Sequence, residues 1–253
     1  MDPLAFVTSL AREAGALLRE RLADRREIAQ KRRHDLVTDA DRASEELIVR
    51  RVRNAYPSAS ILGEESGAFT GTGDERFIVD PLDGTTNYAH RYPLFCVSIA
   101  YERAGLIEAG AIYAPLLDTL FAARRGGGAT RDGIPMRVSA IDDLDRALVC
   151  TGFHPDDYPR NGAHFGLISH HAQAVRRDGS AALDLAFVAA GIFDAFWEFD
   201  LKAWDVAAGA LMIQEAGGRI DAIAGGPLDL TEASILASNG SLHGALRELL
   251  ASV

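Results

Sequence analysis

Residues 80–90 read DPLDGTTNYAH, and they follow the apolar run RFIVD, which ends at Asp80. A short apolar run of this kind predicts a buried strand, so a carboxylate stands where that strand ends. The stretch from Asp80 to Asp83 has the composition of a β-turn with Pro81 at its second position. Such a turn would aim both carboxylates and the carbonyl of Leu82 at one point, an oxygen site suited to Mg²⁺. A solvated surface turn is the alternative, because Asp-Pro and Asp-Gly are common turn dipeptides.

The bulk composition is that of a folded protein with an acidic balance. The chain has 253 residues, which fits one large domain or two small ones, and 48% of them are hydrophobic. Lys and Arg number 26 against 36 Asp and Glu, a formal net charge of −10. This charge argues against direct nucleic-acid partners and acidic membranes, which attract basic surfaces. A small anionic substrate is compatible with it, because a bound metal ion can reverse the local field.

Cysteine usage and hydropathy indicate a cytoplasmic protein. Cys96 and Cys150 lie in apolar runs without metal-ligand spacing, so we expect two buried thiols in a reducing compartment. The first residues have an acid at position 2 and no basic start, so no signal peptide is expected. No apolar run approaches 18 residues, so no membrane span and no membrane partner are expected.

Periodicity predicts α+β structure for residues 1–144 and α/β structure for residues 145–253, together one compact unit with no internal repeat. Short β-type runs between 94 and 139, separated by turn signals, predict an antiparallel meander. Helices are predicted at 4–22, within 39–57, and at 164–173, 180–191, 205–218 and 242–251. Other strands are predicted at 60–62, 77–80, 147–152, 193–199, 219–223 and 235–239.

Three further acidic segments accompany the opening stretch, and each has an ordinary interpretation. Gly63-Glu64-Glu65-Ser66 follows a short strand and can be an exposed polar loop. In DLVTDAD, residues 35–41, Thr38 and Asp41 resemble a capping box with Asp in place of Glu or Gln. Asp205 opens a predicted helix and can be a plain N-cap.

The segments DLVTDAD, GEES, DPLDGTTNY and WDVAAGALMIQEAGG resemble the sequence blocks of the inositol monophosphatase family, in the same order and with similar separations. The resemblance runs from about residue 10 to 245. It implies a layered αβαβα sandwich and Mg²⁺-dependent hydrolysis of a phosphate monoester. Its motifs are much less specific for the substrate than for the superfamily.

Carried over by position, the resemblance assigns two or three Mg²⁺ ions to the acidic residues. The first ion would take Glu64, Asp80 and the carbonyl of Leu82. The second would take Asp80, Asp83 and Asp205, and a third, weaker ion would lie near Glu64. Two metals about 3.5–4 Å apart can activate water on one side of a phosphate and neutralise the leaving oxygen on the other.

Further residues are assigned to water, phosphate and substrate. Asp41, Thr85 and Glu64 are the catalytic residues in this assignment, with Asp41 and Thr85 orienting the attacking water. The backbone of Gly84 and Thr85 would face the phosphate, since a helix beginning there points free N–H groups at an anion. Substrate contacts would come from Asp83, Gly84, Thr85, Gly179, Ser180, Ala181, Glu198 and Asp205. For Glu198 the alternative is an ordinary acid at a strand end.

Several residues depart from the family pattern or have no clear role. Asp178 precedes Gly179 where relatives commonly carry an uncharged residue, and the loop 151–160 matches only weakly. Lys31 lies near the place where relatives have a lysine close to the metals. Together with Arg177 and Lys202 it is interpreted as a surface charge.

The leading hypothesis is hydrolysis of inositol 1-phosphate to inositol and phosphate. Fructose-1,6-bisphosphate, histidinol phosphate or another small polyol or sugar phosphate is the alternative substrate. A nucleotide bisphosphatase is disfavoured, because that branch tends to carry lysine where this chain has Thr86. A protein-binding role in transcription or ribosome assembly, as in some bacterial relatives, is a third hypothesis. A homodimer and inhibition by Li⁺ are expected from the family.

Overall fold

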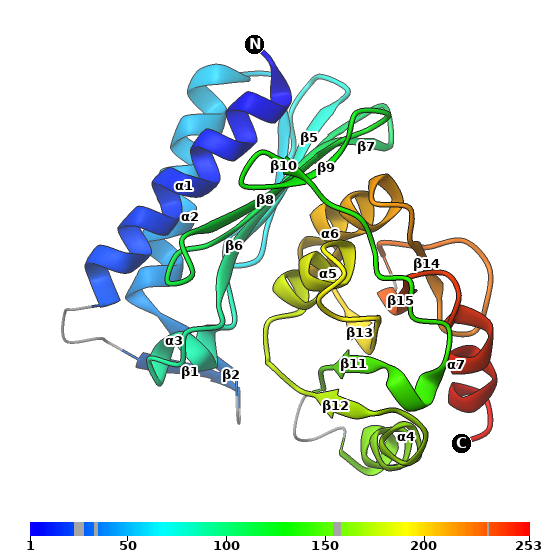
Figure 1. Cartoon of the computed structure of the whole chain (residues 1–253). Coiled ribbons are helices and arrows are strands. Elements are labelled where there is room, and N and C mark those ends of the chain that lie inside the picture. Colours follow the sequence, from blue (N-terminus) through cyan, green and yellow to red (C-terminus); the bar gives the residue numbers. More distant parts are fainter. Residues whose placement is uncertain (23–27, 33–34, 154–157, 232) are drawn as a thin grey trace.

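The structure is a computed structural model that describes residues 1–22, 28–32, 35–153, 158–231 and 233–253. Its elements form five layers, helices alternating with sheets (Figure 1). The outer pair α1 and α2 covers an eight-stranded sheet, α5 and α6 fill the middle, and a five-stranded sheet backed by α4 and α7 closes the other side. This is the αβαβα sandwich that the sequence resemblance implied.

The outer helices α1 (Pro3–Leu22) and α2 (Asp39–Ala55) follow the predicted apolar periodicity. Each presents one buried stripe to the large sheet, with Leu10 and Leu18 on α1 and Ile48 on α2 fully buried or nearly so. The aromatic rings of Phe6, Tyr56 and Phe77 meet edge to face beneath these helices. This packing fixes α2, whose first turn carries Asp41.

The eight-stranded sheet contains the predicted meander. Its strands in spatial order are β10 (Ile134–Pro135), β9 (Gly128–Arg131), β8 (Thr119–Arg124), β7 (Leu106–Ala114), β6 (Cys96–Arg103), β5 (Glu75–Asp83), β3 (Ser60–Gly63) and β4 (Gly67–Phe69). All neighbouring strands are antiparallel except β3 and β5, which run parallel. The parallel pair places the ends of β3 and β5, and hence the residues after Gly63 and Val79, at the same edge of the sheet.

The predicted β-turn from Asp80 to Asp83 is wrong. Strand β5 continues through Asp83, and its register with β6 shifts between Asp80, opposite Ser98, and Asp83, opposite Cys96. Pro81 has no N–H to offer the ladder, which is why a bulge rather than regular pairing occurs here. The bulge lies between the two aspartates, and the backbone N–H of Leu82 donates to the Asp80 carboxylate at 2.9 Å.

Helices α5 (Ala181–Ala189) and α6 (Ala203–Glu215) lie between the two sheets and are almost entirely buried. They approach closely because Gly209 has no side chain: a Cβ there would lie 2.5 Å from Cβ of Leu185. Gly110 of β7 similarly makes room for Ala208. The small residues of AALDLA and AAGALM therefore let two helices share one thin layer, whose N-termini both point to the acidic region.

The five-stranded sheet has the order β12 (Ala174–Arg176), β11 (Leu148–Thr151), β13 (Ala195–Leu201), β15 (Ala233–Ser238) and β14 (Arg219–Ala222). Strand β11 runs parallel to β12 and β13, and β15 is antiparallel to β13 and β14. Helices α4 (Tyr158–His171) and α7 (His243–Leu250) pack on its outer face. A 3₁₀ turn, η1 (Leu144–Arg146), leads into β11.

Some short elements were not predicted. A two-stranded ribbon of β1 (Ile28–Arg32) and β2 (Asp35–Thr38) precedes α2, and β4 and β12 have three residues each. The side chains of Lys31, Asp35 and Thr38 lie outside the described residues, so the proposed capping box and the lysine assignment stay predictions. Cys96 and Cys150 are free and buried, as predicted. Within the described part of the chain, the helices are too short or too polar to cross a membrane.

Candidate active site

The end of β5 places Asp80 in the protein interior. Asp80 is only 2% exposed, and burial together with the charges of Glu64, Asp83 and Asp205 raises its pKa well above the ordinary value. The neighbouring backbone is fixed as well, since Ser44 of α2 donates from Oγ to the carbonyl of Pro81 at 2.8 Å. Asp80 is therefore a rigid carboxylate surrounded by other acids.

Asp83 reaches from the large sheet to the start of α5. Its Oδ2 accepts from Ser180 Oγ at 2.6 Å and from the backbone N–H of Ala182 at 2.8 Å. The Cys96 thiol lies 3.7 Å from the same oxygen. Burial raises the pKa of Asp83, and these donors oppose the rise. Through these contacts, one predicted metal ligand is held by the loop predicted to line the substrate pocket.

Asp205 lies in the first turn of α6, and its Oδ2 accepts from the backbone N–H of Lys202 at 2.7 Å. The N-cap interpretation of the sequence is therefore incomplete: Lys202 is the N-cap, and Asp205 is the third helical residue that closes back onto it. Burial, followed by the charges of Asp83 and Glu64, raises the pKa of Asp205 to about 8. A cap alone would be solvated and unshifted, so the repulsion marks Asp205 as part of the acidic group.

Asp41 and Thr85 meet directly. Asp41 is fully buried in the first turn of α2, and Thr85 opens the short helix α3 (Thr85–Ala89). The hydroxyl of Thr85 lies 2.9 Å from Oδ1 of Asp41 and 3.2 Å from the carbonyl of Leu82. The structure thus joins two residues 44 positions apart that the sequence resemblance assigned to the same role.

Glu64 follows β3 in a loop that α2 holds in place. Glu45, itself 3% exposed, accepts the backbone N–H groups of Glu65 at 2.8 Å and Ser66 at 2.7 Å. Gly63 is required for this approach, since a Cβ there would lie 2.8 Å from the Glu45 carboxylate. Glu45 carries no signal in the sequence, because its role depends on contacts 20 residues away along the chain.

The donor set fits a hard divalent cation in charge and chemistry. Glu64, Asp80, Asp83 and Asp205 act on one another through unfavourable charge interactions, and cations relieve such repulsion. All offer oxygen, the ligand atom that Mg²⁺ prefers. Their spacing is looser than a bound ion requires, because within the described residues the oxygens of Asp80, Asp83 and Asp205 do not all lie within 4.8 Å of one another.

Gly84 and Gly179 allow the DGTT segment and the 178–181 loop to lie against each other. Gly84 has φ 88°, and a Cβ there would lie 3.1 Å from the carbonyl of Leu94 and 3.2 Å from that of Gly179. Asn87 joins the two segments by donating from Nδ2 to the carbonyls of Leu94 at 2.6 Å and Asp178 at 2.7 Å. The sequence did not single out Asn87, whose partners lie up to 92 residues away.

Glu198 is placed on β13 beside the acidic group. Burial raises its pKa well above the ordinary value, with further increases from Asp205 and Asp83 and a decrease from Arg177. Gly152, at the end of β11, makes the space for it: a Cβ at Gly152 would lie 2.1 Å from Oε2 of Glu198. Of the loop 151–160, residues 154–157 lie outside the described residues, so its effect on specificity stays untested.

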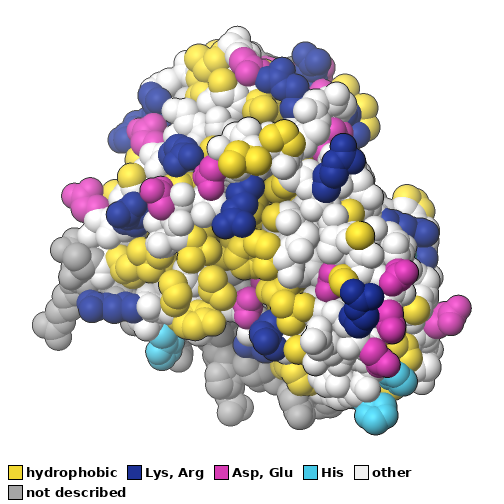
Figure 2. All heavy atoms as spheres, viewed as in Figure 1, with side chains coloured by type: hydrophobic (Ala, Val, Ile, Leu, Met, Phe, Trp, Pro, Cys, Tyr) yellow, Lys and Arg dark blue, Asp and Glu magenta, His cyan; other side chains and the backbone are white. Residues whose placement is uncertain are grey.

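Two of the three residues interpreted as surface charges are exposed, as expected. Arg177 and Lys202 are exposed, and Arg177 donates to the carbonyl of Phe153. On the face shown in Figure 2, Lys and Arg side chains lie among Asp and Glu side chains around a central area of hydrophobic side chains. The described residues of this face therefore form no continuous basic patch.

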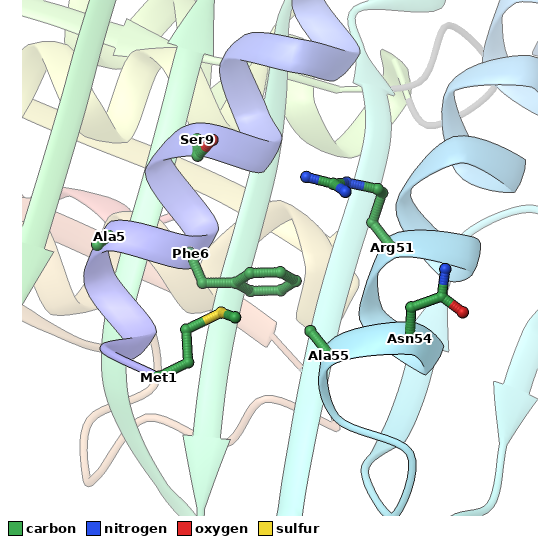
Figure 3. A pocket seen from close by; sticks show the side chains of 7 residues that line it. All are labelled: Met1, Ala5, Phe6, Ser9, Arg51, Asn54 and Ala55. Carbon is green, nitrogen blue, oxygen red and sulfur yellow. The ribbon is translucent and has the colours of Figure 1, made fainter.

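A separate cavity lies between α1 and α2. Its volume is about 410 Å³, and it is lined by Met1, Ala5, Phe6, Ser9, Arg51, Asn54 and Ala55 (Figure 3). Ala55 is 14 residues beyond Asp41 on the same helix, about 20 Å at 1.5 Å per residue. This cavity is therefore remote from the acidic group.

Comparison with known proteins agrees with the fold and the acidic motifs. Residues 2–253 match the model of the inositol monophosphatase family. An inositol-1-monophosphatase of Synechocystis is 41% identical over 98% of this chain and 88% of its own length. A protein named Nus factor SuhB from Pseudomonas aeruginosa is 42% identical over 97% of this chain and 95% of its own length.

Among solved structures, an inositol monophosphatase from Anabaena superimposes with a TM-score of 0.89. It is 42% identical in sequence, and the match covers 99% of this chain and 95% of that one. Sequence and fold lead to the same assignment. This chain belongs to the inositol monophosphatase family and is a phosphatase of that type.

Proposed function

We propose that this protein hydrolyses inositol 1-phosphate to inositol and phosphate and requires Mg²⁺. The observation that supports this most is the meeting of four acids from the loop after β3, the end of β5 and the start of α6. The charges of Glu64, Asp83 and Asp205 raise the pKa of buried Asp80, and those of Asp83 and Glu64 raise the pKa of Asp205, an arrangement that costs stability unless cations are bound. Proteins retain such groups where function requires them.

Two or three Mg²⁺ ions would be held by Glu64, Asp80, the Leu82 carbonyl, Asp83 and Asp205. When bound, they would supply charge to neutralise the phosphate and to acidify water. The chain's own contribution is positioning. Asp41 accepts the hydroxyl hydrogen of Thr85, which leaves the Thr85 oxygen lone pairs oriented to accept a hydrogen from the attacking water. Glu64 is the second group proposed to orient water.

The phosphate and the polyol would be bound by different segments. Gly84 and Thr85 would offer backbone N–H groups to phosphate at the start of α3. The loop residues Gly179, Ser180 and Ala181 would line the pocket for the inositol ring. Glu198 would accept hydrogen bonds from the hydroxyls of that ring. The contact of Ser180 and Ala182 with Asp83 supports this arrangement, because it brings the loop that would line the inositol ring beside the proposed metal ligands.

The test is phosphate release from inositol 1-phosphate, fructose-1,6-bisphosphate and histidinol phosphate, each with and without Mg²⁺. We expect release only with Mg²⁺ and the highest kcat/KM for inositol 1-phosphate. Asp83→Asn should reduce turnover at least about 10³-fold, because it removes a charged ligand while keeping an acceptor for Ser180. The exposed Asp142→Asn is the matched control. Comparable turnover in Asp83→Asn, or full activity in EDTA, would remove the proposed mechanism.

A protein-binding role is the second candidate, and the observation that favours it is the 42% identity to a protein named Nus factor SuhB. Such a role would use the surface rather than the acidic group. Pull-down from a bacterial lysate with the wild type and with Asp83→Asn separates the two roles. Specific capture of transcription proteins that survives loss of turnover supports the second candidate, and absence of capture argues against it.

We also propose a cytoplasmic homodimer inhibited by Li⁺. The free, buried Cys96 and Cys150 support a reducing compartment. Light scattering after gel filtration would measure a mass of about twice 27.2 kDa for the dimer. Li⁺ inhibition is measured in the same phosphate-release assay.

A further inference from the structure

A second group of potential metal ligands lies outside the proposed active site. It consists of Cys150 at β11, Asp178 in the loop after β12, and Asp184 in the first turn of α5. The Cys150 sulfur and one carboxylate oxygen from each aspartate all lie within 4.8 Å of one another. Among the described residues, this is the only trio of Cys, His, Asp or Glu side chains gathered so closely.

Asp184 is an unusual member of this group because its carboxylate is buried without a hydrogen-bond donor at normal geometry. The side chain is 1% exposed, and neither carboxylate oxygen has a hydrogen-bond partner among the described residues. The Cys150 thiol lies close enough to interact with it, but not in the geometry of a hydrogen bond. A buried carboxylate without a donor costs free energy, so it either holds a proton or accompanies a cation.

The surrounding charges do not supply that cation. Burial raises the pKa of Asp184 well above its ordinary value, and the nearby charges of Asp178, Asp83 and Glu198 raise it further. Burial likewise raises the pKa of Asp178 and of the Cys150 thiol. The main groups that act on Asp184 include no Lys or Arg, although the charge of Arg176 opposes the rise at Asp178.

We infer that Cys150, Asp178 and Asp184 bind one divalent cation of borderline softness, such as Zn²⁺ or Co²⁺. A thiolate with two carboxylates favours these ions over Mg²⁺, which prefers oxygen ligands. The ligand atoms of a tetrahedral site with bonds of about 2.0–2.3 Å lie about 3.5 Å apart, so closure requires each pair of ligand atoms to approach by at most about 1.3 Å. Water completes the coordination from the side of Asp178, which is half-buried, whereas Cys150 is fully buried.

This site is distinct from the proposed catalytic one but close to it in the chain. Asp178 precedes Gly179, and Ser180 holds Asp83. A cation bound to Asp178 and Asp184 would therefore hold both ends of the segment 178–184. This segment contains the residues proposed to line the inositol ring. The proposed cation site takes part in no step of phosphate hydrolysis, so its test is independent of the test of the proposed function.

The test uses Co²⁺ as a spectroscopic probe on the full-length protein. The metal-free protein, kept reduced with a phosphine, is saturated with Mg²⁺ to occupy oxygen sites and is then titrated with Co²⁺. We expect one equivalent of Co²⁺ to produce a near-ultraviolet sulfur-to-cobalt charge-transfer absorption. Cys150→Ser should abolish this band, and Cys96→Ala should retain it, which separates the two thiols.

Affinity measurements on Asp178→Asn keep the inference testable if a change at a buried position prevents folding. Asp178 is on a half-buried loop, so the variant should fold, and Co²⁺ should bind more than about tenfold more weakly, since even changes outside the ligand set cost about 10–100-fold. Asp142→Asn is the matched control. No sulfur-to-cobalt band in the wild type, a band that persists in Cys150→Ser, or unchanged affinity in Asp178→Asn would each overturn the site.

Discussion

At the start of α6, Asp205 carries a carboxylate whose pKa is raised to about 8 by burial and by the charges of Asp83 and Glu64. Its pKa in the unfolded chain is near 3.8. A group whose pKa is raised on folding contributes stability that is present below its unfolded pKa and lost as the pH rises through its folded pKa. In the metal-free protein, Asp205 therefore lowers stability increasingly between about pH 4 and pH 8.

Asp205→Asn should raise the Tm of the protein in EDTA at pH 8, because the amide keeps the capping oxygen but removes the charge. We expect a gain of about 4 °C or more, since 1 kcal/mol corresponds to about 2–4 °C in a chain of this size. The gain should shrink at pH 5, where the wild-type carboxyl is protonated in the folded state. Calorimetry at both pH values measures this, with Asp142→Asn as control. A Tm equal to or below the wild-type value at pH 8 would contradict the repulsion.

Gly152 is a second position where the change of a single residue should alter the proposed active site. Gly152→Ala would place Cβ 2.1 Å from Oε2 of Glu198 and force that carboxylate to move. We expect KM for inositol 1-phosphate to rise about tenfold and KM for p-nitrophenyl phosphate, which lacks ring hydroxyls, to change little. Gly166→Ala on α4, where a Cβ would meet nothing within 4 Å, is the control. Equal changes for both substrates would mean that Glu198 does not read hydroxyls.

At the scale of elements, the loop after β3 depends on α2. Glu45→Gln should weaken the anchoring of the loop that carries Glu64, because the amide group sets an N–H donor against one of the two backbone N–H groups. We expect the Mg²⁺ concentration for half-maximal activity to rise about tenfold, with most of kcat recovered at saturating Mg²⁺.

Hydrogen exchange gives a second readout of this anchoring that does not depend on metal. The amides of Glu65 and Ser66 should exchange faster in Glu45→Gln than in the wild type. The exposed Glu46→Gln, one position along the same helix, should leave both measurements unchanged. Unchanged exchange in Glu45→Gln would show that the loop is held by other contacts.

The long elements were predictable from sequence because each carries its own periodic signal. Helices α1, α2, α5 and α6 and the strands of the meander followed the expected patterns closely. Strands β4 and β12 were missed because three residues carry no periodicity, and they exist only through pairing with neighbours. The bulged end of β5 was mistaken for a turn because Asp, Pro and Gly favour both, and only the pairing with β6 decides between them.

The candidate site was predictable to the extent that its residues occur in compact motifs. The acids and Thr85 follow from DPLDGTT and its partner segments, and their mutual repulsion agrees with that assignment. Glu45, Asn87 and Gly152 could not be predicted, because each acts on a segment far along the chain and has no local pattern.

For the whole molecule, His243 of α7 links β15 and β14, which are neighbouring strands of the five-stranded sheet. Its Nδ1 lies 2.9 Å from Ser238 Oγ and its Nε2 2.8 Å from Asp221 Oδ1, and Arg247 pairs with the same aspartate. Burial lowers the pKa of His243 below its ordinary 6.5, although Asp221 opposes the shift. A histidine whose pKa falls on folding contributes stability that is present above its unfolded pKa and lost as the pH falls.

The Tm in saturating Mg²⁺ should therefore fall between pH 7 and pH 5, and His243→Gln should reduce that slope because glutamine does not take up a proton. The exposed His170→Gln, at the end of α4, is the control and should keep the wild-type slope. Calorimetry across this pH range measures both. A wild-type slope in His243→Gln would show that other groups control acid stability.

The division at residues 144 and 145 stays a prediction, although the two main sheets respect it: one ends at Pro135 and the other begins at Leu148. The hydrogen bonds of Asp83 with Ser180 and Ala182 join partners 97 and 99 residues apart, across that division. A nascent chain that has emerged only as far as the meander thus already contains the DPLDGTT motif, with Ser44 and Asp41 to contact it, but lacks the two donors that hold Asp83. Turnover should be among the last properties to appear during synthesis, after the middle helices have docked.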